Sequence, residues 1–173
     1  SPQLAFTVTP FFSKVDEQNA DITEQKIYLI GFRSFGTELE ASYKLGNFVA
    51  TAGATYTKAS IEKSLDATEV GNTPRRVPDL MYNFNPSYSI GKFDLGLSFI
   101  GTTKVFTQND NKIVLPGFMY TNAYASYEIT KGLSMSVNVN NLFNTLGFTE
   151  AEGTSFTDNA TNYMRARPIT GRL

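Results

Sequence analysis

The chain has 173 residues, of which 41% are hydrophobic, and its formal charge at pH 7 is −1. This balance excludes a strongly basic nucleic-acid-binding protein and a disordered acidic tail, so no nucleic-acid partner is expected. The sequence contains no cysteine and no histidine, which excludes zinc sites built on those residues, cysteine nucleophiles and His-dependent triads. We therefore expect neither an enzyme nor a protein with a metal site or a cofactor.

Apolar and polar residues alternate along seven segments, and this period of two predicts β-strands with one polar and one apolar face. In chain order, these segments begin near Leu4, Thr37, Phe48, Leu80, Phe93, Tyr120 and Leu133. In the last segment, Leu133, Met135, Val137 and Val139 share one face, and serine and asparagine residues share the other. No stretch reaches the ~18 consecutive apolar residues that indicate a transmembrane helix.

Short and long connections alternate between these segments. The short ones, at 45–48, 90–93 and 130–133, contain glycine, which favours tight hairpin turns. The long, polar ones lie at roughly 15–26, 60–78, 107–114 and 147–166. All tight turns therefore belong to one end of the sheet, as in bacterial outer-membrane barrels.

Two further features favour a membrane barrel. The segments are about ten residues or longer, which is enough to cross a membrane at a tilt of about 45°. Aromatic residues lie near the segment ends, as in the interfacial girdles of membrane barrels. The sequence thus predicts an all-β, antiparallel transmembrane β-barrel. From the pattern alone, a soluble β-sandwich or a small soluble ligand-binding barrel remains an alternative.

Several motifs resemble those of the TonB-dependent receptors, the gated importers of bacterial outer membranes. Residues 137–144, with the sequence VNVNNLFN, resemble the family's NVxNLFN signature, and residues 36–43 resemble its GxExE strand. Residues 75–78, 117–123 and 167–172 resemble a loop-to-strand entry, the start of the strand before the signature, and the approach to the last strand. These motifs occur in the family's order and cover most of the chain.

The resemblance implies a location in the bacterial outer membrane, in contact with its lipid, and a barrel of about 22 strands around a plug domain. Residues 1–173 would be the C-terminal portion of that barrel, a fragment of about seven to eight strands. Neither a plug domain nor a TonB box is recognisable in the sequence, so the TonB complex would act through a missing plug. An isolated fragment has open strand edges, through which we expect it to self-associate.

By the same resemblance, the whole receptor would import a scarce nutrient too large for porins. An iron–siderophore complex is the leading ligand class, and a carbohydrate or cobalamin is the alternative. A hypothesis of another class is a complete eight-stranded outer-membrane barrel that acts as an anchor or adhesin, because the length of the chain also fits such a barrel.

Candidate ligand contacts lie in the long, outer connections. Arginine binds carboxylates and phosphates through its fork of donors, and aromatic rings stack on sugars or chelates. The candidates are Arg75, Arg76, Phe148, Phe156, Tyr163 and Arg165. The alternative is that these residues are solvated charges and rings that pack the loops.

Polar residues of the strands suggest further sites. Glu38 and Glu40 share one face of a strand. They fit an acid–base pair or a hard-cation site, but we favour a polar lumen where Lys44 or a plug arginine meets them. The signature's Asn138, Asn140 and Asn141 fit ligand contacts, although bonds to the plug or to neighbouring backbone groups are favoured.

Overall fold

The computed structural model describes residues 3–21, 26–152, 162–165 and 170–172, and most of these are in β-strands. The elements in chain order are β1 (Gln3–Asp21), β2 (Lys26–Leu45), β3 (Phe48–Lys63), the 3-10 helix η1 (Ala67–Glu69), β4 (Leu80–Ile90), β5 (Phe93–Thr102), β6 (Val105–Phe106), β7 (Val114–Leu115), β8 (Phe118–Thr130), β9 (Leu133–Asn140), β10 (Phe148–Glu152), β11 (Asn162–Arg165) and β12 (Thr170–Arg172). Within the described ranges, no helix is both long and apolar enough to cross a membrane.

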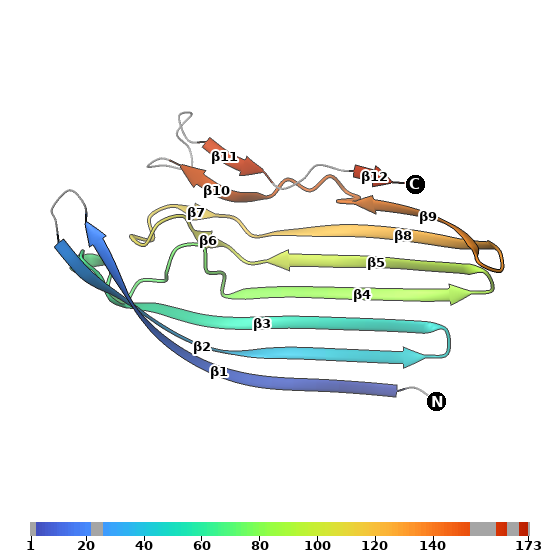
Figure 1. The fold of residues 1–173 in the computed structure, drawn as a ribbon, viewed down its shortest axis with the longest axis horizontal. Helices are drawn as coiled ribbons and strands as arrows, with labels where there is room; N and C mark the ends of the chain where they lie inside the picture. The colour runs from blue at the N-terminus through green and yellow to red at the C-terminus, as the bar shows by residue number, and fades with distance from the viewer. Residues whose placement is uncertain (1–2, 22–25, 153–161, 166–169, 173) are drawn as a thin grey trace.

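Eight strands form one antiparallel sheet in the order β1-β2-β3-β4-β5-β8-β9-β12 (Figure 1). Each strand thus pairs with its neighbours along the chain, apart from short excursions at the loop end. In this order β1 and β12 occupy opposite edges, and the sheet is not closed. The expected all-β barrel fragment is confirmed, whereas a closed eight-stranded barrel is not favoured because it would pair β1 with the last strand.

The tight turns all lie at one end of the sheet, as predicted (Figure 1). Gly46, Gly91 and Gly132 adopt φ values of 57°, 59° and 84° in these turns. An L side chain rarely adopts such positive φ values, which is why the turns require glycine. The short connections are therefore fixed by local backbone sterics.

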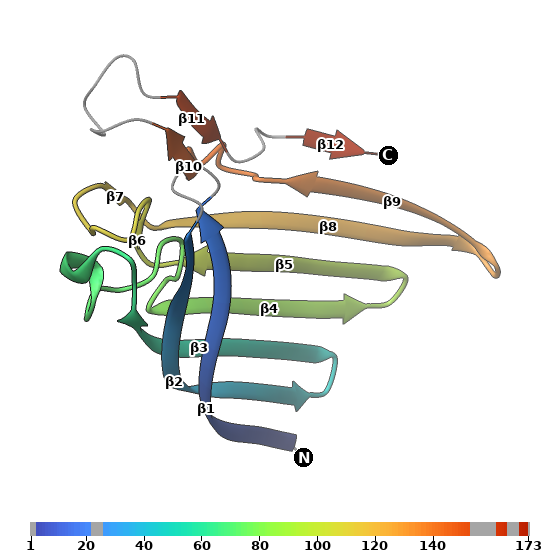
Figure 2. The same ribbon diagram turned by 60° about the vertical axis from the view of Figure 1, so that its left-hand side comes forward.

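The opposite end differs from the prediction, because three predicted loops contain strand pairs. The segment predicted as a loop at 15–26 is mostly strand, with β1 and β2 paired as far as Asp21 and Lys26. The pair β6–β7 flanks the predicted loop at 107–114 and closes it into a hairpin, and β10–β11 lies in the loop at 147–166. Figure 1 shows these pairs at the end opposite the tight turns, and Figure 2 shows that the far half of the β1–β2 hairpin turns away from the direction of β4 and β5. Outside the membrane, backbone pairing continues without the apolar alternation that lipid imposes, so the hydrophobic pattern does not reveal it.

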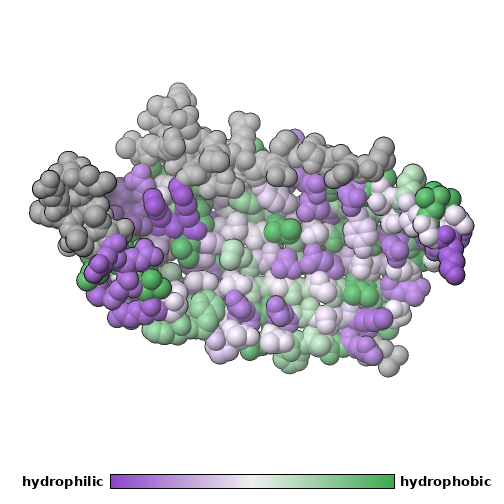
Figure 3. All heavy atoms as spheres, viewed as in Figure 1, coloured by the Kyte–Doolittle hydropathy of each residue, from purple (hydrophilic) through white to green (hydrophobic). Residues whose placement is uncertain are grey.

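The register gives the sheet two chemically different faces. On the apolar face, one row across six strands consists of Phe6, Ala41, Ala52, Phe84, Phe99 and Thr121. The adjacent row on the polar face consists of Thr7, Glu40, Gly53, Asn83, Ile100 and Tyr120. Figure 3 is turned toward the polar face, where hydrophilic side chains follow the strands.

No second layer covers the apolar face in the described part of the chain. Leu95 and Leu97 lie in the middle of the sheet, yet 43% and 38% of their surfaces are exposed. The buried hydrophobic residues of the described part are Ala50, Ala59, Ile61, Ile113 and Leu115. A soluble sandwich or barrel would bury one whole face of the sheet. This arrangement disfavours the soluble alternative and leaves lipid as the solvent that matches the apolar face.

Candidate functional site

Two outer loops are joined by asparagine side chains into one structure, which we call the loop platform (residues 64–79 and 103–117). The Asn111 side chain accepts a hydrogen bond from the Thr73 backbone N–H at 2.9 Å and donates one to the Thr73 carbonyl at 2.7 Å. Asn109 accepts from the Arg75 backbone N–H at 3.0 Å, and its own carbonyl accepts from the Asn72 side chain at 2.9 Å. Amide side chains thus join two loops that form no strand pair with each other.

The loop platform has buried apolar residues of its own and lies against another in β3. Ile113 and Leu115 of the β6–β7 hairpin are almost completely buried, and so is Ile61 near the end of β3. The Ile61 carbonyl accepts a hydrogen bond from the Gly71 N–H at 2.8 Å, which folds the loop back onto β3. The platform therefore has a small core of its own, and we expect it to be more ordered than a solvated loop.

Ion pairs hold the β1–β2 hairpin against the end of β3. Glu62 lies 3.2 Å from the Lys14 ammonium and 3.1 Å from the Arg33 guanidinium. The Lys63 ammonium donates a hydrogen bond to Asp16 at 2.8 Å, and this bond lowers the pKa of the Asp16 carboxyl below its ordinary value. These pairs are exposed, so each contributes little to stability and is weakened by salt.

A hollow of about 540 Å³ lies between the hairpin and the loop platform. Its lining residues are Glu17, Ile30, Phe32, Arg33, Ser34, Thr57, Ala59, Pro74, Arg75, Val77 and Asn109. The Arg33 guanidinium is engaged by Glu62, whereas Arg75 contributes an exposed side chain whose backbone is fixed by Asn109. An apolar wall beside an arginine suits a ligand that combines apolar surface with an anionic group.

Of the predicted ligand contacts whose side chains the structure describes, Arg75 alone lines this hollow. Arg76 adopts a φ of 61°, and its backbone N–H donates to the Phe106 carbonyl at 2.8 Å. Phe148 begins β10, next to the platform strand β7. Phe156 lies outside the described residues. Tyr163 and Arg165 belong to β11, opposite Ala151 and Phe148, and their side chains are not described.

Sequence reasoning missed the hairpin side of the hollow. Glu17 and Ile30 were expected to lie in or beside a loop, yet they face each other across paired strands. The apolar run at 27–32 was a usable signal, because such a run next to a polar segment indicates a strand that packs on something. Asn109 had no signal in the sequence, since its role depends on a loop distant along the chain.

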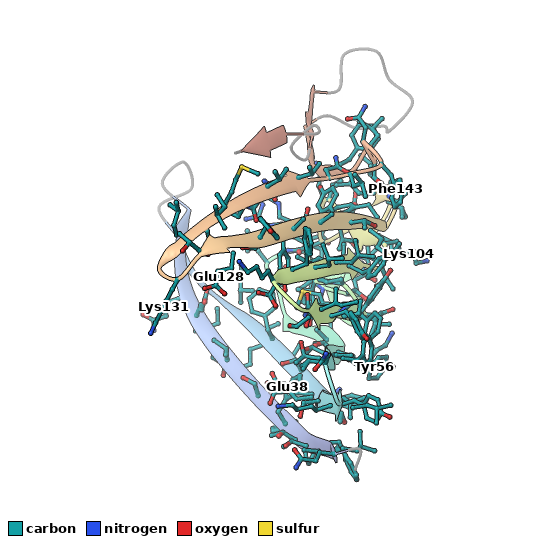
Figure 4. All side chains as sticks on the ribbon, turned by 90° about the vertical axis from the view of Figure 1, so that its right-hand side faces the viewer. Glu38, Tyr56, Lys104, Glu128, Lys131 and Phe143 are labelled. Atoms are coloured by element: carbon teal, nitrogen blue, oxygen red, sulfur yellow. The ribbon has the colours of Figure 1, made fainter. Side chains whose placement is uncertain are left out.

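The polar face carries the predicted glutamate pair. Figure 4 shows the sheet end-on, with Glu38 and Glu128 toward its concave side and Tyr56 on the other side. Glu38 and Glu40 line a shallow hollow of about 460 Å³ with Thr55, Asn83 and Thr102. Neither glutamate forms an ion pair with Lys44 or with another residue of the described ranges. The polar lumen that the sequence predicts thus presents two carboxylates to whatever fills it.

Beside these glutamates, short polar side chains bond to one another along the strands. Asn85 donates to Thr51 at 3.3 Å and to Asn83 at 3.0 Å, and it accepts from the Ser98 hydroxyl at 2.7 Å. Amides and hydroxyls satisfied in this way form a rigid, hydrophilic wall. Among the described residues, no group of three or more aspartate or glutamate side chains is placed to hold a metal ion.

Comparison with known proteins agrees with this architecture. Residues 4–142 match the family model described as "TonB dependent receptor-like, beta-barrel". No curated protein sequence matches the chain. Among solved structures, the chain resembles the unliganded ferric citrate transporter FecA, with a TM-score of 0.75 and 21% identity over 96% of this chain and 28% of that one.

Two further solved structures have similar folds. The siderophore receptor PiuA from Acinetobacter baumannii gives a TM-score of 0.77 and 19% identity, over 96% of this chain and 25% of that one. The ferric yersiniabactin uptake receptor FyuA from Yersinia pestis gives a TM-score of 0.81 and 14% identity, over 97% and 26%. The chain thus spans about a quarter of each of these structures. It belongs to the TonB-dependent receptor family, whose members are outer-membrane β-barrels of Gram-negative bacteria.

Proposed function

We propose that residues 1–173 are the C-terminal part of the barrel of a receptor that imports an iron–siderophore complex. The family consists of receptors and transporters rather than enzymes. In this proposal, the ligand binds at the outer loops, the polar face lines the passage, and the TonB complex acts through a plug outside this chain. Glu38 and Glu40 would then face basic groups of that plug.

The main support for this ligand class is the hollow beside Arg75. Ferric chelates of this class combine apolar or aromatic surface with anionic oxygens, and the hollow offers Phe32 and Val77 beside an arginine. The hydrogen bond that the Arg75 backbone N–H donates to the Asn109 side chain fixes the backbone at this arginine before the ligand binds, which lowers the entropic cost of binding. The similar structures named above include receptors for ferric citrate and for ferric yersiniabactin, which supports the same ligand class.

The test is a binding measurement on the purified full-length receptor, with ferric siderophores, cobalamin and oligosaccharides as separate probes. We expect a ferric siderophore to bind and the other two classes not to bind. A charge-assisted hydrogen bond is worth about 1.5–3 kcal/mol, so Arg75→Ala should weaken binding about 10- to 150-fold. Lys92→Ala, in a tight turn at the other end of the sheet, serves as the matched control and should leave the affinity unchanged.

Two results would contradict different parts of the proposal. Binding of cobalamin or an oligosaccharide, with no affinity for any ferric chelate, would show that the ligand class is wrong. Equal affinity of the Arg75→Ala variant and the unmodified receptor for a ferric siderophore would show that the hollow is not the binding site.

A further inference from the structure

The signature motif ends in a turn that the side chain of its third asparagine, Asn141, holds together by hydrogen bonds. Asn141 is only 3% exposed and adopts a φ of 51°. Its side chain donates to the Thr145 carbonyl at 3.0 Å and accepts from the Thr145 N–H at 2.8 Å. Its backbone N–H donates to the Asn122 side chain at 2.9 Å, and its carbonyl accepts from Asn144 at 2.8 Å. These bonds connect both sides of the turn and attach it to β8.

This rigid turn displays a large apolar side chain that packs against little else. Phe143, at the tip of the turn, is 71% exposed, which is the highest value among the large hydrophobic residues of the described part. A polar side chain would serve equally well at the tip if the turn faced water. Leu146, three residues further along, is 56% exposed as well. Two large apolar side chains that are exposed on one short segment, held by four hydrogen bonds, indicate a surface that contacts an apolar partner.

The position of Phe143 identifies that partner. Figure 4 places Phe143 on the same side of the sheet as Tyr56, opposite Glu38 and Glu128. The neighbouring Leu142 donates its backbone N–H to Thr121 at 2.7 Å, and Thr121 belongs to the apolar face. The turn is therefore continuous with the surface that contacts lipid.

The depth of Phe143 corresponds to the outer interface. The Leu142 N–H donates to the Thr121 carbonyl, so the turn lies level with Thr121 of β8. Thr121 lies nine positions before Thr130, which pairs with Leu133 at the tight-turn end. At about 3.3 Å per residue and a tilt of about 40°, nine residues of strand rise by about 23 Å along the membrane normal. This rise is close to the height of the apolar band of outer-membrane barrels, which is about 25 Å. If Leu133 lies at the inner boundary, Phe143 lies at the outer one.

We propose that Phe143 is a membrane anchor that inserts at the boundary between headgroups and acyl chains in the outer leaflet. Asn141 is its positioning residue, since it fixes the turn without contacting the lipid. The signature motif thus sets the depth of this part of the barrel in the membrane. This role is independent of which ligand the receptor imports.

The test measures the depth of position 143 in the full-length receptor, reconstituted into vesicles of phosphatidylcholine and phosphatidylglycerol. Phe143→Cys carries a nitroxide, and collisions with oxygen, which partitions into lipid, are compared with collisions with a water-soluble nickel chelate. Residues 1–173 contain no cysteine, and any cysteine elsewhere in the receptor is replaced by serine. Matched variants are Leu97→Cys at the centre of the apolar face, Lys131→Cys in a tight turn and Glu128→Cys on the polar face.

We expect the oxygen-to-nickel collision ratio at position 143 to be several-fold higher than at position 131 and lower than at position 97. A ratio equal to that at position 131 would place Phe143 in water and overturn the proposal. Low collision rates with both reagents, as on a protein-covered surface, would show that another protein segment is the partner and would also overturn it.

The role of Asn141 is tested by the same reporter in an Asn141→Gly background. Glycine tolerates the positive φ but lacks the side-chain bonds to Thr145, so backbone strain does not confuse the result. We expect the nitroxide at position 143 to become more mobile and its collision ratio to shift toward water, while the barrel still folds. Unchanged mobility and depth would refute the positioning role and leave the anchor to be judged by the first measurement.

Discussion

A charge on the apolar face should destabilise the protein according to its depth, and Leu97→Arg is the sharpest case. Leu97 lies near the middle of β5 and pairs with Ala123 of β8 on the apolar face. An arginine that faces lipid at the bilayer midplane costs about 2–4 kcal/mol, and this cost falls to about 0–1 kcal/mol near the interfaces. The substitution should therefore lower the equilibrium constant for folding into the membrane about 30- to 900-fold.

Two matched variants show whether the effect depends on the depth of the arginine in the membrane and on the face of the sheet that carries it. Ile90→Arg lies on the same face beside the tight turn at Gly91, where the side chain reaches water, so about 0–1 kcal/mol is expected. Ser136→Arg lies on the polar face, where Ser136 is exposed and pairs with Ser126. There the charge remains solvated, and the effect should again be small.

The assay is folding of the full-length receptor into lipid vesicles, followed in guanidinium by fluorescence and by the fast gel migration of folded barrels. The reasoning predicts a large loss for Leu97→Arg and small losses for the other two variants. If Leu97→Arg were as stable as Ile90→Arg, or if Ser136→Arg were the most damaging variant, the assignment of the apolar face to lipid would be refuted.

Three further predictions concern local structure. A Cβ at Gly96 would overlap the Tyr124 ring across the β5–β8 pair, so Gly96→Ala should destabilise folding by about 1–3 kcal/mol; a Tyr124→Ala background should remove most of that cost, and a loss that persists there would contradict the overlap. Asn111→Ala removes both hydrogen bonds to Thr73 and should reduce the stability of the loop platform by about 1–3 kcal/mol. Amide exchange should become faster in residues 64–79 and stay unchanged in β8, and unchanged exchange in residues 64–79 would show that these bonds are dispensable. Hydrogen bonds from Thr68 lower the pKa of the Asp66 carboxyl. The ionised Asp66 cap therefore stabilises η1 fully above the ordinary pKa of about 3.9, and this stabilisation is lost as the pH falls through the lowered pKa. Exchange protection of the Thr68 amide should follow that pH dependence in the unmodified protein and not in Asp66→Asn, and the same pH profile in both proteins would argue against the cap.

The membrane-spanning part of the fold is predictable from the sequence because one rule governs it. Lipid requires an apolar residue at every second position, and the predicted segments at Phe48, Leu80, Phe93 and Leu133 begin at the first residues of β3, β4, β5 and β9. The glycine turns follow from local sterics. Each membrane-spanning strand can therefore be predicted from its own short stretch of sequence.

The outer end of the molecule is less predictable, since its contacts join segments far apart in the chain. Asn111 and Thr73 are 38 positions apart, and Asn109 and Arg75 are 34 apart. Nothing in the local sequence of Asn109 indicates that it fixes the backbone of Arg75. The β1–β2 hairpin shows the same limit, because beyond the membrane β1 carries polar residues on both faces and β2 carries a continuous apolar run at 27–32, so neither strand shows the alternation. Of the candidate site, the sequence therefore identified Arg75 but not the hairpin wall that faces it.

The central claim is that the sheet is a barrel wall with one face toward lipid and one toward the lumen. A nitroxide scan along β8 in the membrane-reconstituted receptor tests it most directly, with oxygen as the lipid-soluble collision partner. The account predicts high oxygen collision rates at Ala123, Ala125 and Tyr127 and low rates at the intervening Asn122, Tyr124 and Ser126. The reverse alternation, or rates without a period of two, would contradict it.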